Sequence, residues 1–173
     1  MSSAIEAITW QNEKIVLLDQ TQIPISENYI SYDEISTFIV AIQQLVVRGA
    51  PALGVAGAYG VVLAIDEAKR KGLSAQELEH NIDLLRDARP TAVNLAWAVE
   101  QIRKHLPAGR DAVLAAAHQL AREDKESSTS MGNIGADWLI DKLGKKPLTL
   151  LTHCNTGSLA TTGTGTALGV IKE

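Results

Sequence analysis

Residues 148–166 decide the fold, and they read Leu148-Thr149-Leu150-Leu151-Thr152-His153-Cys154 and then Asn155-Thr156-Gly157-Ser158-Leu159-Ala160-Thr161-Thr162-Gly163-Thr164-Gly165-Thr166. We expect a strand over 148–153. The Gly- and Thr-rich run after it is typical of parallel α/β domains, where backbone N–H groups at a helix start face an anion. A parallel strand pair needs a crossover of a dozen or more residues. We therefore predict the first strand and helix start of a Rossmann-like parallel-sheet domain, truncated after its loop.

The sequence before this stretch predicts a mainly helical domain with a small antiparallel β element. Residues 5–9 and 15–19 are β-prone and flank a turn, which is typical of a hairpin. Periodic apolar residues predict helices over 35–46, 50–65, 74–87, 92–106, 112–122 and 134–143. The fold class is therefore mixed α/β, with an N-terminal domain at 1–143 and the start of a second domain at 144–173.

Several local signals set the expected helix ends. Ser31-Tyr32-Asp33-Glu34 and Ser74-Ala75-Gln76-Glu77 are capping boxes that predict helix starts. Pro51 suits the first turn of a helix, and Arg89-Pro90-Thr91 predicts a break. The tract 127–130, which contains only Ser and Thr, weakens the helix prediction locally.

Glycine recurs every three residues in the apolar segment 50–65, at Gly54, Gly57 and Gly60. Glycine inside a helix costs about 1 kcal/mol relative to alanine, so its repetition calls for a reason. Two interpretations stay open: close packing against other helices, or a backbone groove beside a ligand.

Composition excludes several classes of function. The chain has 173 residues, is 46% hydrophobic and 21% charged, and carries a net charge of −4. With 4% aromatic residues and no basic cluster, nucleic-acid binding is not expected. The apolar run 50–65 is shorter than the roughly 18 residues of a membrane span, so we expect a core helix and no membrane association. No signal peptide is indicated, and a single cysteine fits a cytoplasmic location.

The Gly/Thr loop is a candidate phosphate site, with Gly157, Thr162, Gly163, Thr164 and Gly165 as candidate ligands. Flexible glycine amides and threonine hydroxyls suit a phosphate monoester. A purely structural turn is the alternative interpretation. The spacing of Gly163, Gly165 and Gly169 exceeds the dinucleotide fingerprint by one residue, which leaves an NAD-dependent oxidoreductase as a weak third reading.

Three side chains outside this loop could carry chemistry. Cys154 ends the expected strand, where ligands bind in open α/β sheets, although a buried inert thiol is the alternative. Arg48 and Arg89 each precede a proline-marked break, and a guanidinium binds phosphate through a fork of hydrogen bonds. Alternatively, either arginine could serve only to interact with the negative end of a helix dipole at a helix C-terminus. The histidines His80, His105 and His118 are expected to be solvated, and no metal site or cofactor is predicted.

At these residues the sequence resembles the methylthioribose-1-phosphate isomerases, the aldose–ketose isomerases of methionine salvage. The matching segments are 46–54 (Val-Val-Arg-Gly-Ala-Pro-Ala-Leu-Gly), 89–95 (Arg-Pro-Thr-Ala-Val-Asn-Leu) and 151–160 (Leu-Thr-His-Cys-Asn-Thr-Gly-Ser-Leu-Ala). Trp10 and residues 17–20 also fit. Ribose-1,5-bisphosphate isomerase and the regulatory subunits of eukaryotic translation initiation factor 2B share the architecture, and this chain matches the N-terminal half.

The resemblance implies roles for residues of this chain. Arg48, Gly49 and Ala50 would bind a sugar phosphate, Arg89 would contact its phosphate or sugar, and Cys154 would be the catalytic cysteine. The family's second catalytic group, an aspartate, belongs to a later part of the second domain, so we expect the isolated chain to be inactive. The resemblance also implies a homodimer and no cofactor. A regulatory subunit that senses a sugar phosphate or nucleotide without converting it remains the alternative.

Overall fold

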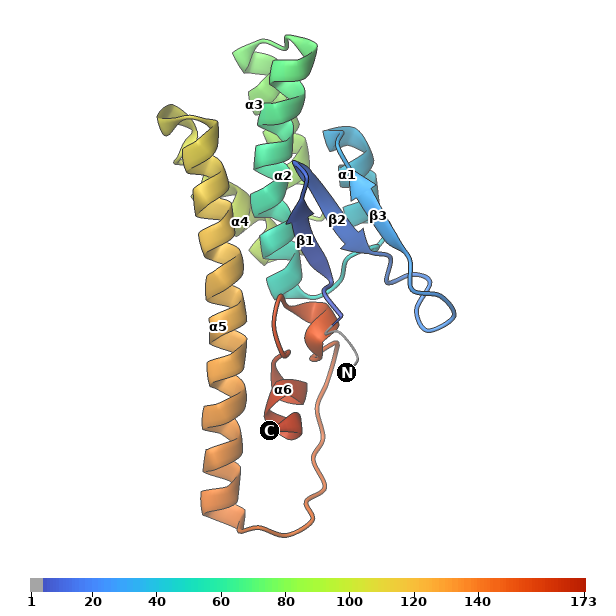
Figure 1. Cartoon of the computed structure of the whole chain (residues 1–173), viewed down its shortest axis with the longest axis vertical. Helices are drawn as coiled ribbons and strands as arrows, with labels where there is room; N and C mark the ends of the chain where they lie inside the picture. The colour runs from blue at the N-terminus through green and yellow to red at the C-terminus, as the bar shows by residue number, and fades with distance from the viewer. Residues whose placement is uncertain (1–4) are drawn as a thin grey trace.

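A small antiparallel sheet packs against a group of helices built around one long buried helix (Figure 1). The computed structural model describes residues 5–173. The strands are β1 (Ile8–Gln11), β2 (Lys14–Leu18) and β3 (Tyr29–Tyr32), in the order β1-β2-β3. The helices are α1 (Ile35–Gln43), α2 (Ala50–Lys71), α3 (Ala75–Arg86), α4 (Val93–Arg103), α5 (Arg110–Leu143) and α6 (Ala167–Lys172), with 3-10 turns η1 (Leu106–Ala108) and η2 (Ser158–Ala160). The expected mainly helical domain with a small β element is confirmed.

The predicted hairpin is present, and a third strand extends it. Ile8 pairs with Leu17 in the β1–β2 ladder, and Leu18 pairs with Tyr29 in the β2–β3 ladder. The prediction of a capping box at Ser31 was wrong, because Ser31 lies within β3. The amide of Ile35, at the start of α1, instead donates to the buried carboxylate of Glu67 in α2. A side chain distant in sequence therefore supplies this cap.

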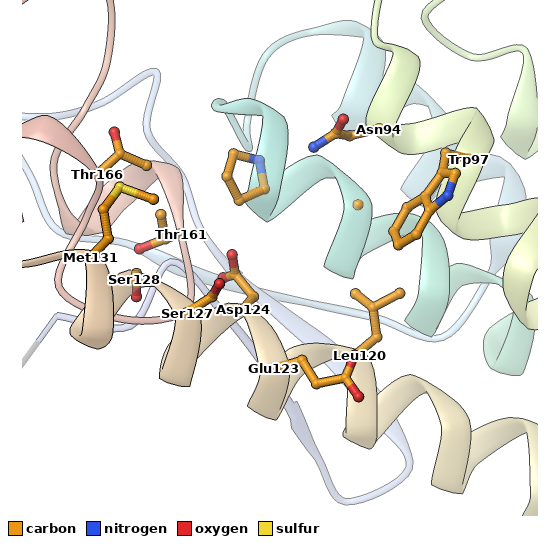
Figure 2. Close-up of a pocket in the computed structure, with 12 residues that line it drawn as sticks. Asn94, Trp97, Leu120, Glu123, Asp124, Ser127, Ser128, Met131, Thr161 and Thr166 are labelled. Carbon is orange, nitrogen blue, oxygen red and sulfur yellow. The ribbon is translucent and has the colours of Figure 1, made fainter. Parts of the chain in front are cut away.

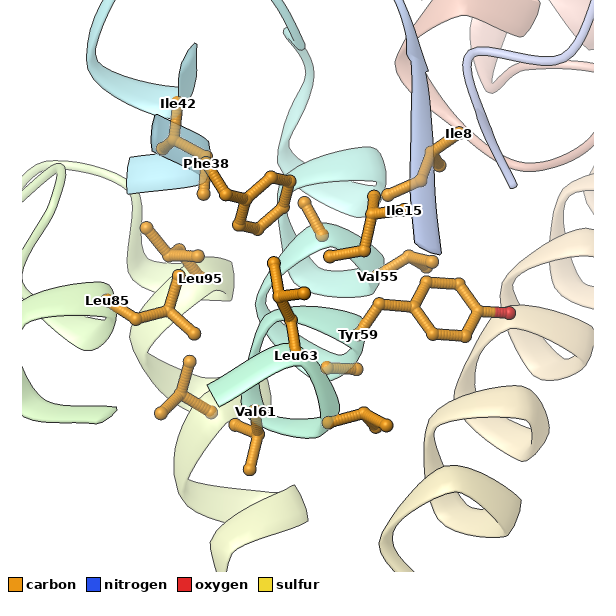
Figure 3. Close-up of a cluster of buried hydrophobic side chains, with 14 of the residues drawn as sticks. Ile8, Ile15, Phe38, Ile42, Val55, Tyr59, Val61, Leu63, Leu85 and Leu95 are labelled. Carbon is orange, nitrogen blue, oxygen red and sulfur yellow. The ribbon is translucent and has the colours of Figure 1, made fainter. Parts of the chain in front are cut away.

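Helix α2 forms the centre of the core (Figure 3). By length and composition it could cross a membrane, but 78% of its most apolar window is buried inside the protein, so it serves here as the core helix. A Cβ built on Gly57 would lie 3.0 Å from a methyl of Leu95 in α4, and one on Gly60 would lie 2.6 Å from a methyl of Leu85 in α3. The glycine repeat therefore serves close packing between helices.

Helix α5 is longer than the sequence indicated. The Ser/Thr tract does not interrupt it, because the hydroxyls of Ser128 and Thr129 donate to the carbonyl of Lys125 at 3.0 and 2.9 Å, within the helix. Its first residue, Arg110, forms a two-point ion pair with Asp66 of α2, at 2.9 and 2.8 Å. The helix thus runs unbroken from the core to the lower end of the molecule (Figure 1).

The C-terminal segment returns along α5 and ends beside it (Figure 1). Residues 148–153, predicted as a strand, form an irregular exposed segment, because no neighbouring strand among the described residues pairs with them. Helix α6 packs on the second half of α5, where a Cβ on Gly135 would lie 2.7 Å from a methyl of Val170. The chain thus brings the Gly/Thr loop back against the helical domain.

Candidate functional site

A cavity of about 320 Å³ lies where the first turns of α2 and α4 face α5 and the Gly/Thr loop (Figure 2). Its lining residues come from four segments of the chain: Pro51, Gly54, Asn94, Trp97, Leu120, Glu123, Asp124, Ser127, Ser128, Met131, Thr161 and Thr166. The lining combines apolar side chains with four hydroxyl groups and the carboxylates of Glu123 and Asp124.

Two helices begin at this cavity because the local sequence starts them there. Gly49 caps α2 with a φ of 96°, in a region that favours glycine, and Pro51 occupies the first turn. Helix α4 begins at Val93, directly after the break at Arg89-Pro90-Thr91. The first backbone N–H groups of a helix have no partner within it, and the helix dipole adds partial positive charge. Both ends therefore favour an anion.

The Gly/Thr loop is pressed against the start of α2. A Cβ on Gly49 would lie 2.5 Å from Ala160, so only glycine fits at this contact. The side-chain amide of Gln20, which is buried, donates to the carbonyl of Leu159 at 2.9 Å. The resemblance-derived segment 48–50 and the loop are therefore neighbours, although they are far apart in sequence.

The loop amides already have partners inside the protein. The N–H groups of Gly163 and Gly165 donate to the hydroxyl oxygen of Thr161, at 3.1 and 3.2 Å. The amide and the hydroxyl of Thr162 both lie 2.6 Å from a carboxylate oxygen of Asp124 in α5. The loop thus gathers its donors around oxygen atoms, as an anion-binding loop would, but here those atoms belong to the chain itself.

Thr164 and Gly165 complete the turn. The hydroxyl of Thr164 is buried without a hydrogen-bond partner among the described residues. Gly165 has a φ of 99°, and a Cβ there would lie 2.6 Å from the carbonyl oxygen of Thr156. Gly157 approaches Leu168, with its built Cβ at 3.2 Å from a methyl group. The two glycines thus serve the tight folding of the loop, and phosphate binding by these residues stays a prediction.

The two candidate arginines precede the two helices that open at the cavity. Arg48 is exposed, and its Nε donates to the carbonyl of Leu45 at 3.1 Å, close to the end of α1. Arg89 is half-buried. Neither side chain lines the cavity, although the residues that follow them, Pro51 and Asn94, do.

Cys154 is exposed and lies at the end of the irregular segment 148–153, with a φ of 71°. The alternative of a buried inert thiol therefore does not hold in this structure. Cys154 is not among the residues that line the cavity. Its proposed catalytic role stays a prediction, because the segment that carries it has no paired strand to fix its position.

Sequence reasoning missed several residues that line the cavity. Asn94 lies within the Arg89–Leu95 segment, and Trp97 follows about one turn later on α4. The exposed side chain of Trp97, at helical spacing from Asn94, was a signal that could have indicated this part of the site. Asp124 carried no such signal, because its partner Thr162 is distant in the sequence. These contacts depend on tertiary structure.

A second group of side chains lies around His118, for which the expectation of a solvated side chain was wrong. Its Nδ1 lies 3.0 Å from the hydroxyl of Tyr59, whose ring stacks on Trp10 with centroids 5.5 Å apart. Burial lowers the pKa of His118 below its ordinary value, and the nearby charges of Arg122 and Arg110 lower it further. His80 and His105 are exposed, as expected. Among residues 5–173, no three His, Cys, Asp or Glu side chains are grouped to hold a metal ion.

Comparison with known proteins places this arrangement among its relatives. The profile of the initiation factor 2 subunit family matches residues 46–173. The methylthioribose-1-phosphate isomerase of Azotobacter vinelandii is 43% identical over 178 residues, which cover 97% of this chain and 49% of that protein. The isomerase of the same name from Stutzerimonas stutzeri is 43% identical over 175 residues, with the same coverage. The chain spans about half the length of the curated relatives it matches.

Two solved structures share the fold. The 5-methylthioribose 1-phosphate isomerase of Pyrococcus horikoshii matches with a TM-score of 0.83 and 29% identity, over 98% of this chain and 49% of that one. The translation initiation factor eIF-2B subunit delta of A. fulgidus matches with a TM-score of 0.80 and 36% identity, over 98% of this chain and 50% of that one.

Proposed function

The chain belongs to the initiation factor 2 subunit family, and we propose that it forms the N-terminal half of an isomerase that converts 5-methylthioribose 1-phosphate to 5-methylthioribulose 1-phosphate. The observation that carries the proposal is 43% identity to proteins of that activity over 97% of this chain. The segments 46–54, 89–95 and 151–160, on which the resemblance rests, border the cavity or the loop beside it.

We place the phosphate group at the first turns of α2 and α4. The helix dipoles favour an anion there, and Arg48 and Arg89 precede these two turns. Gly49 and Ala50 would supply close backbone contact with the substrate, and the loop 157–165 would close over it. The hydroxyls of Thr161 and Thr166 face the same cavity and could bond to the sugar.

The reaction asks for a fixed phosphate and a proton donor in a site with little water. Phosphate on the anomeric oxygen prevents the sugar ring from opening to a free aldehyde. The enzyme must protonate the ring oxygen and move one hydrogen from C2 to C1, so that C2 is oxidised and C1 is reduced within the same molecule. Such steps are served by positioned acid–base groups in a dry pocket. We assign Cys154 to the position next to C1 and C2, as the catalytic cysteine that the resemblance implies.

We propose that residues 148–153 become the first strand of a Rossmann-like sheet when the second half of the protein is present. The segment is apolar, and Leu151 is fully exposed in this structure. The relatives' extra length is sufficient for such a domain. The catalytic aspartate that the resemblance implies would then approach Cys154 from that domain.

We further propose that the complete protein is a cytoplasmic homodimer and that it does not bind nucleic acid. The net charge of −4 and the scarcity of aromatic residues argue against a nucleic-acid partner. The named isomerases supply a small sugar phosphate as the class of substrate.

A regulatory subunit without catalysis is the second candidate. The observation that favours it is the eIF-2B subunit delta of A. fulgidus, which is 36% identical to this chain, whereas the isomerase of Pyrococcus horikoshii is 29% identical. Such a subunit would bind a sugar phosphate at the same cavity and release it unchanged.

Turnover of 5-methylthioribose 1-phosphate separates the two candidates. The complete gene product should convert the aldose phosphate to the ketose phosphate, as followed by the carbon NMR signals of C1 and C2. We expect no turnover by the 173-residue chain alone, because the resemblance assigns the catalytic aspartate to the second domain. Binding of the substrate without conversion by the complete gene product would favour the regulatory subunit.

A further inference from the structure

Helix α5 lines two cavities that differ in charge. The candidate site is lined by the carboxylates of Glu123 and Asp124. A second cavity, of about 260 Å³, is lined by His118, Arg122 and Lys125 of the same helix. With about 3.6 residues per turn, positions 118, 122 and 125 fall on one face of the helix, whereas 123 and 124 fall on another. The helix thus presents acidic groups to the candidate site and basic groups to the second cavity.

The facing wall of the second cavity is held in place by aromatic packing. Trp10 comes from β1, Tyr59 from α2 and Thr162 from the Gly/Thr loop. The rings of Trp10 and Tyr59 stack with centroids 5.5 Å apart, and Figure 3 shows the Tyr59 ring extending from α2 toward α5. The Tyr59 hydroxyl lies 3.0 Å from Nδ1 of His118. The walls of the cavity are therefore fixed by contacts within the protein.

The two cations of this cavity have no acidic partner. Among residues 5–173, neither Arg122 nor Lys125 forms an ion pair. The guanidinium of Arg122 donates instead to the neutral side-chain amide oxygen of Gln119, at 2.6 Å. The described lining contains one carboxylate, that of the exposed Glu6. Two cations therefore outnumber one carboxylate around the cavity, and this balance favours an anion.

Two titratable groups of the cavity respond to the charge of Arg122. Burial lowers the pKa of His118, and the charges of Arg122 and Arg110 lower it further. Burial raises the pKa of the Tyr59 hydroxyl, and the charge of Arg122 opposes this rise. Arg110 is already paired with Asp66, at 2.8 Å. An anion beside Arg122 would offset its charge and favour the protonated form of His118.

We propose that Arg122, Lys125 and His118 form a second oxyanion site, which takes inorganic phosphate or the phosphate group of a small ester. Arginine binds phosphate through a fork of hydrogen bonds, and lysine adds a compact positive charge. When the Tyr59 hydroxyl donates to Nδ1 of His118, Nε2 carries the hydrogen and is a donor for the same anion. The site uses no residue that lines the candidate site, so it does not rest on the proposed function.

The Gly/Thr loop contributes to both cavities. Thr161 lines the candidate site, whereas its neighbour Thr162 lines the second cavity. The hydroxyl of Thr162 also donates to the carbonyl of Ala121 on α5, at 2.9 Å. An anion in the second cavity would therefore lie next to the loop without occupying the candidate site. This position suits an effector and not a reacting group.

The test follows the binding of inorganic phosphate to the complete gene product labelled with 5-fluorotryptophan. Trp10 lines the second cavity, Trp97 lines the candidate site, and Trp138 lines neither. Their fluorine NMR signals, assigned by replacing each tryptophan with phenylalanine, therefore report on the two cavities separately. Phosphate should shift the Trp10 signal in a saturable manner and leave the Trp138 signal in place. Absence of any shift of the Trp10 signal would overturn the proposal.

Substitutions of charged residues then identify the ligands of the anion. Arg122→Gln and Lys125→Gln should each raise the phosphate Kd read from the Trp10 signal by at least about tenfold, because each removes a charge-assisted hydrogen bond. Glu6→Gln should lower this Kd by removing a repulsive charge. Lys142→Gln is the matched control, because Lys142 is exposed on α5 and does not line the cavity, and it should change the Kd by less than about twofold. An unchanged Kd in both Arg122→Gln and Lys125→Gln, or an equal rise in Lys142→Gln, would contradict the site.

Ribose 5-phosphate, as a second probe, separates a free ion from an ester. A shift of the Trp10 signal at a lower concentration than that of inorganic phosphate would identify a phosphate ester as the ligand. A shift at the same or a higher concentration would identify the free ion, and either result supports the oxyanion site. A shift of the Trp97 signal alone, with both probes, would place the anion in the candidate site and overturn the proposal. Turnover of 5-methylthioribose 1-phosphate is measured separately, so the failure of one proposal leaves the other in place.

Discussion

The carboxylate of Asp124, on α5, holds the Gly/Thr loop through Thr162, whose backbone amide and hydroxyl both lie 2.6 Å from the same oxygen. One side chain thus ties the loop to the longest helix of the protein. The carboxylate also occupies the type of position in which this loop was expected to hold a phosphate group. Phosphate binding there requires the loop to rearrange or Asp124 to release Thr162.

Asp124→Ala should free the loop without unfolding the protein. Hydrogen bonds to a charged acceptor contribute about 1.5–3 kcal/mol, and here they stabilise a local structure. The amides of Thr162 and Gly163 should exchange with solvent at least about tenfold faster, as measured by NMR. Asp137→Asn, an exposed position on the same helix, is the control. Unchanged exchange at Thr162 in Asp124→Ala would show that other contacts hold the loop.

Arg48→Ala and Arg89→Ala should each weaken sugar-phosphate binding by the complete gene product. A charge-assisted hydrogen bond to phosphate is worth about 1.5–3 kcal/mol, so KM should rise by roughly 10- to 100-fold. Arg→Lys should not restore it fully, because an ammonium group cannot form the fork of a guanidinium. Steady-state kinetics and calorimetry measure both effects. If neither constant moved, the two arginines would serve only the helix ends.

Cys154→Ser should separate chemistry from binding. If the thiol takes part in moving hydrogen between C1 and C2, kcat of the complete gene product should fall by at least about a hundredfold, while the substrate Kd changes little. Cys154 is exposed in this structure, so the substitution should not disturb the packing. Single-turnover kinetics and calorimetry provide the two measurements. Full activity of the variant would remove Cys154 from the mechanism.

Gly60→Ala and Gly54→Ala should have opposite effects on stability, although both lie on α2. A Cβ at Gly60 would lie 2.6 Å from Leu85 and 3.0 Å from Phe38, whereas one at Gly54 meets nothing closer than 3.5 Å. Overpacking costs about 1–3 kcal/mol, and removing a helical glycine gains up to about 1 kcal/mol. Urea unfolding should therefore show a loss for Gly60→Ala and a neutral or positive change for Gly54→Ala. Equal changes would contradict the assigned packing.

His118 should make the protein less stable in mild acid. Its pKa is lowered in the folded state, so the unfolded chain binds more protons once the pH falls through the ordinary value of 6.5. The stability that this neutral histidine contributes is therefore complete above about pH 7 and declines below the ordinary pKa. Urea unfolding at about pH 7.5 and pH 5.5 should show a smaller difference in His118→Gln than in wild type. His80→Gln, at an exposed position, should retain the wild-type difference.

The sequence predictions were correct where the interacting residues are close together in the sequence, and they failed where those residues are far apart. The capping box at Ser74 was correct, because Glu77 and the helix start lie within one turn of it. The one expected at Ser31 failed, because strand pairing occupied that residue and Glu67, from another helix, took over the cap. Hydrogen bonds within one helical turn can be predicted from neighbouring residues, whereas contacts between segments that are distant in the sequence cannot.

The candidate site shows the same division. The sequence marked Gly49 and the Gly/Thr loop, since glycine patterns and prolines report on the local backbone. It did not mark Asp124 or Trp97, which take part in the site only because α4 and α5 lie on either side of the cavity. The strand expected at 148–153 depends on a partner strand, and no local signal could supply one.

The hydrogen bond between Gln20 and Leu159 joins residues that lie 139 positions apart in the sequence. This separation affects the order in which contacts form while the protein is being synthesised. A ribosome adds about 5–20 residues per second, so Gln20 is made roughly 7–28 s before its partner. During that interval α1, α3 and α4 can pack around α2, whereas the loop that contacts Gly49 has not yet been synthesised. The contact between Gly49 and the loop is therefore made after the contacts among α1 to α4 have been able to form.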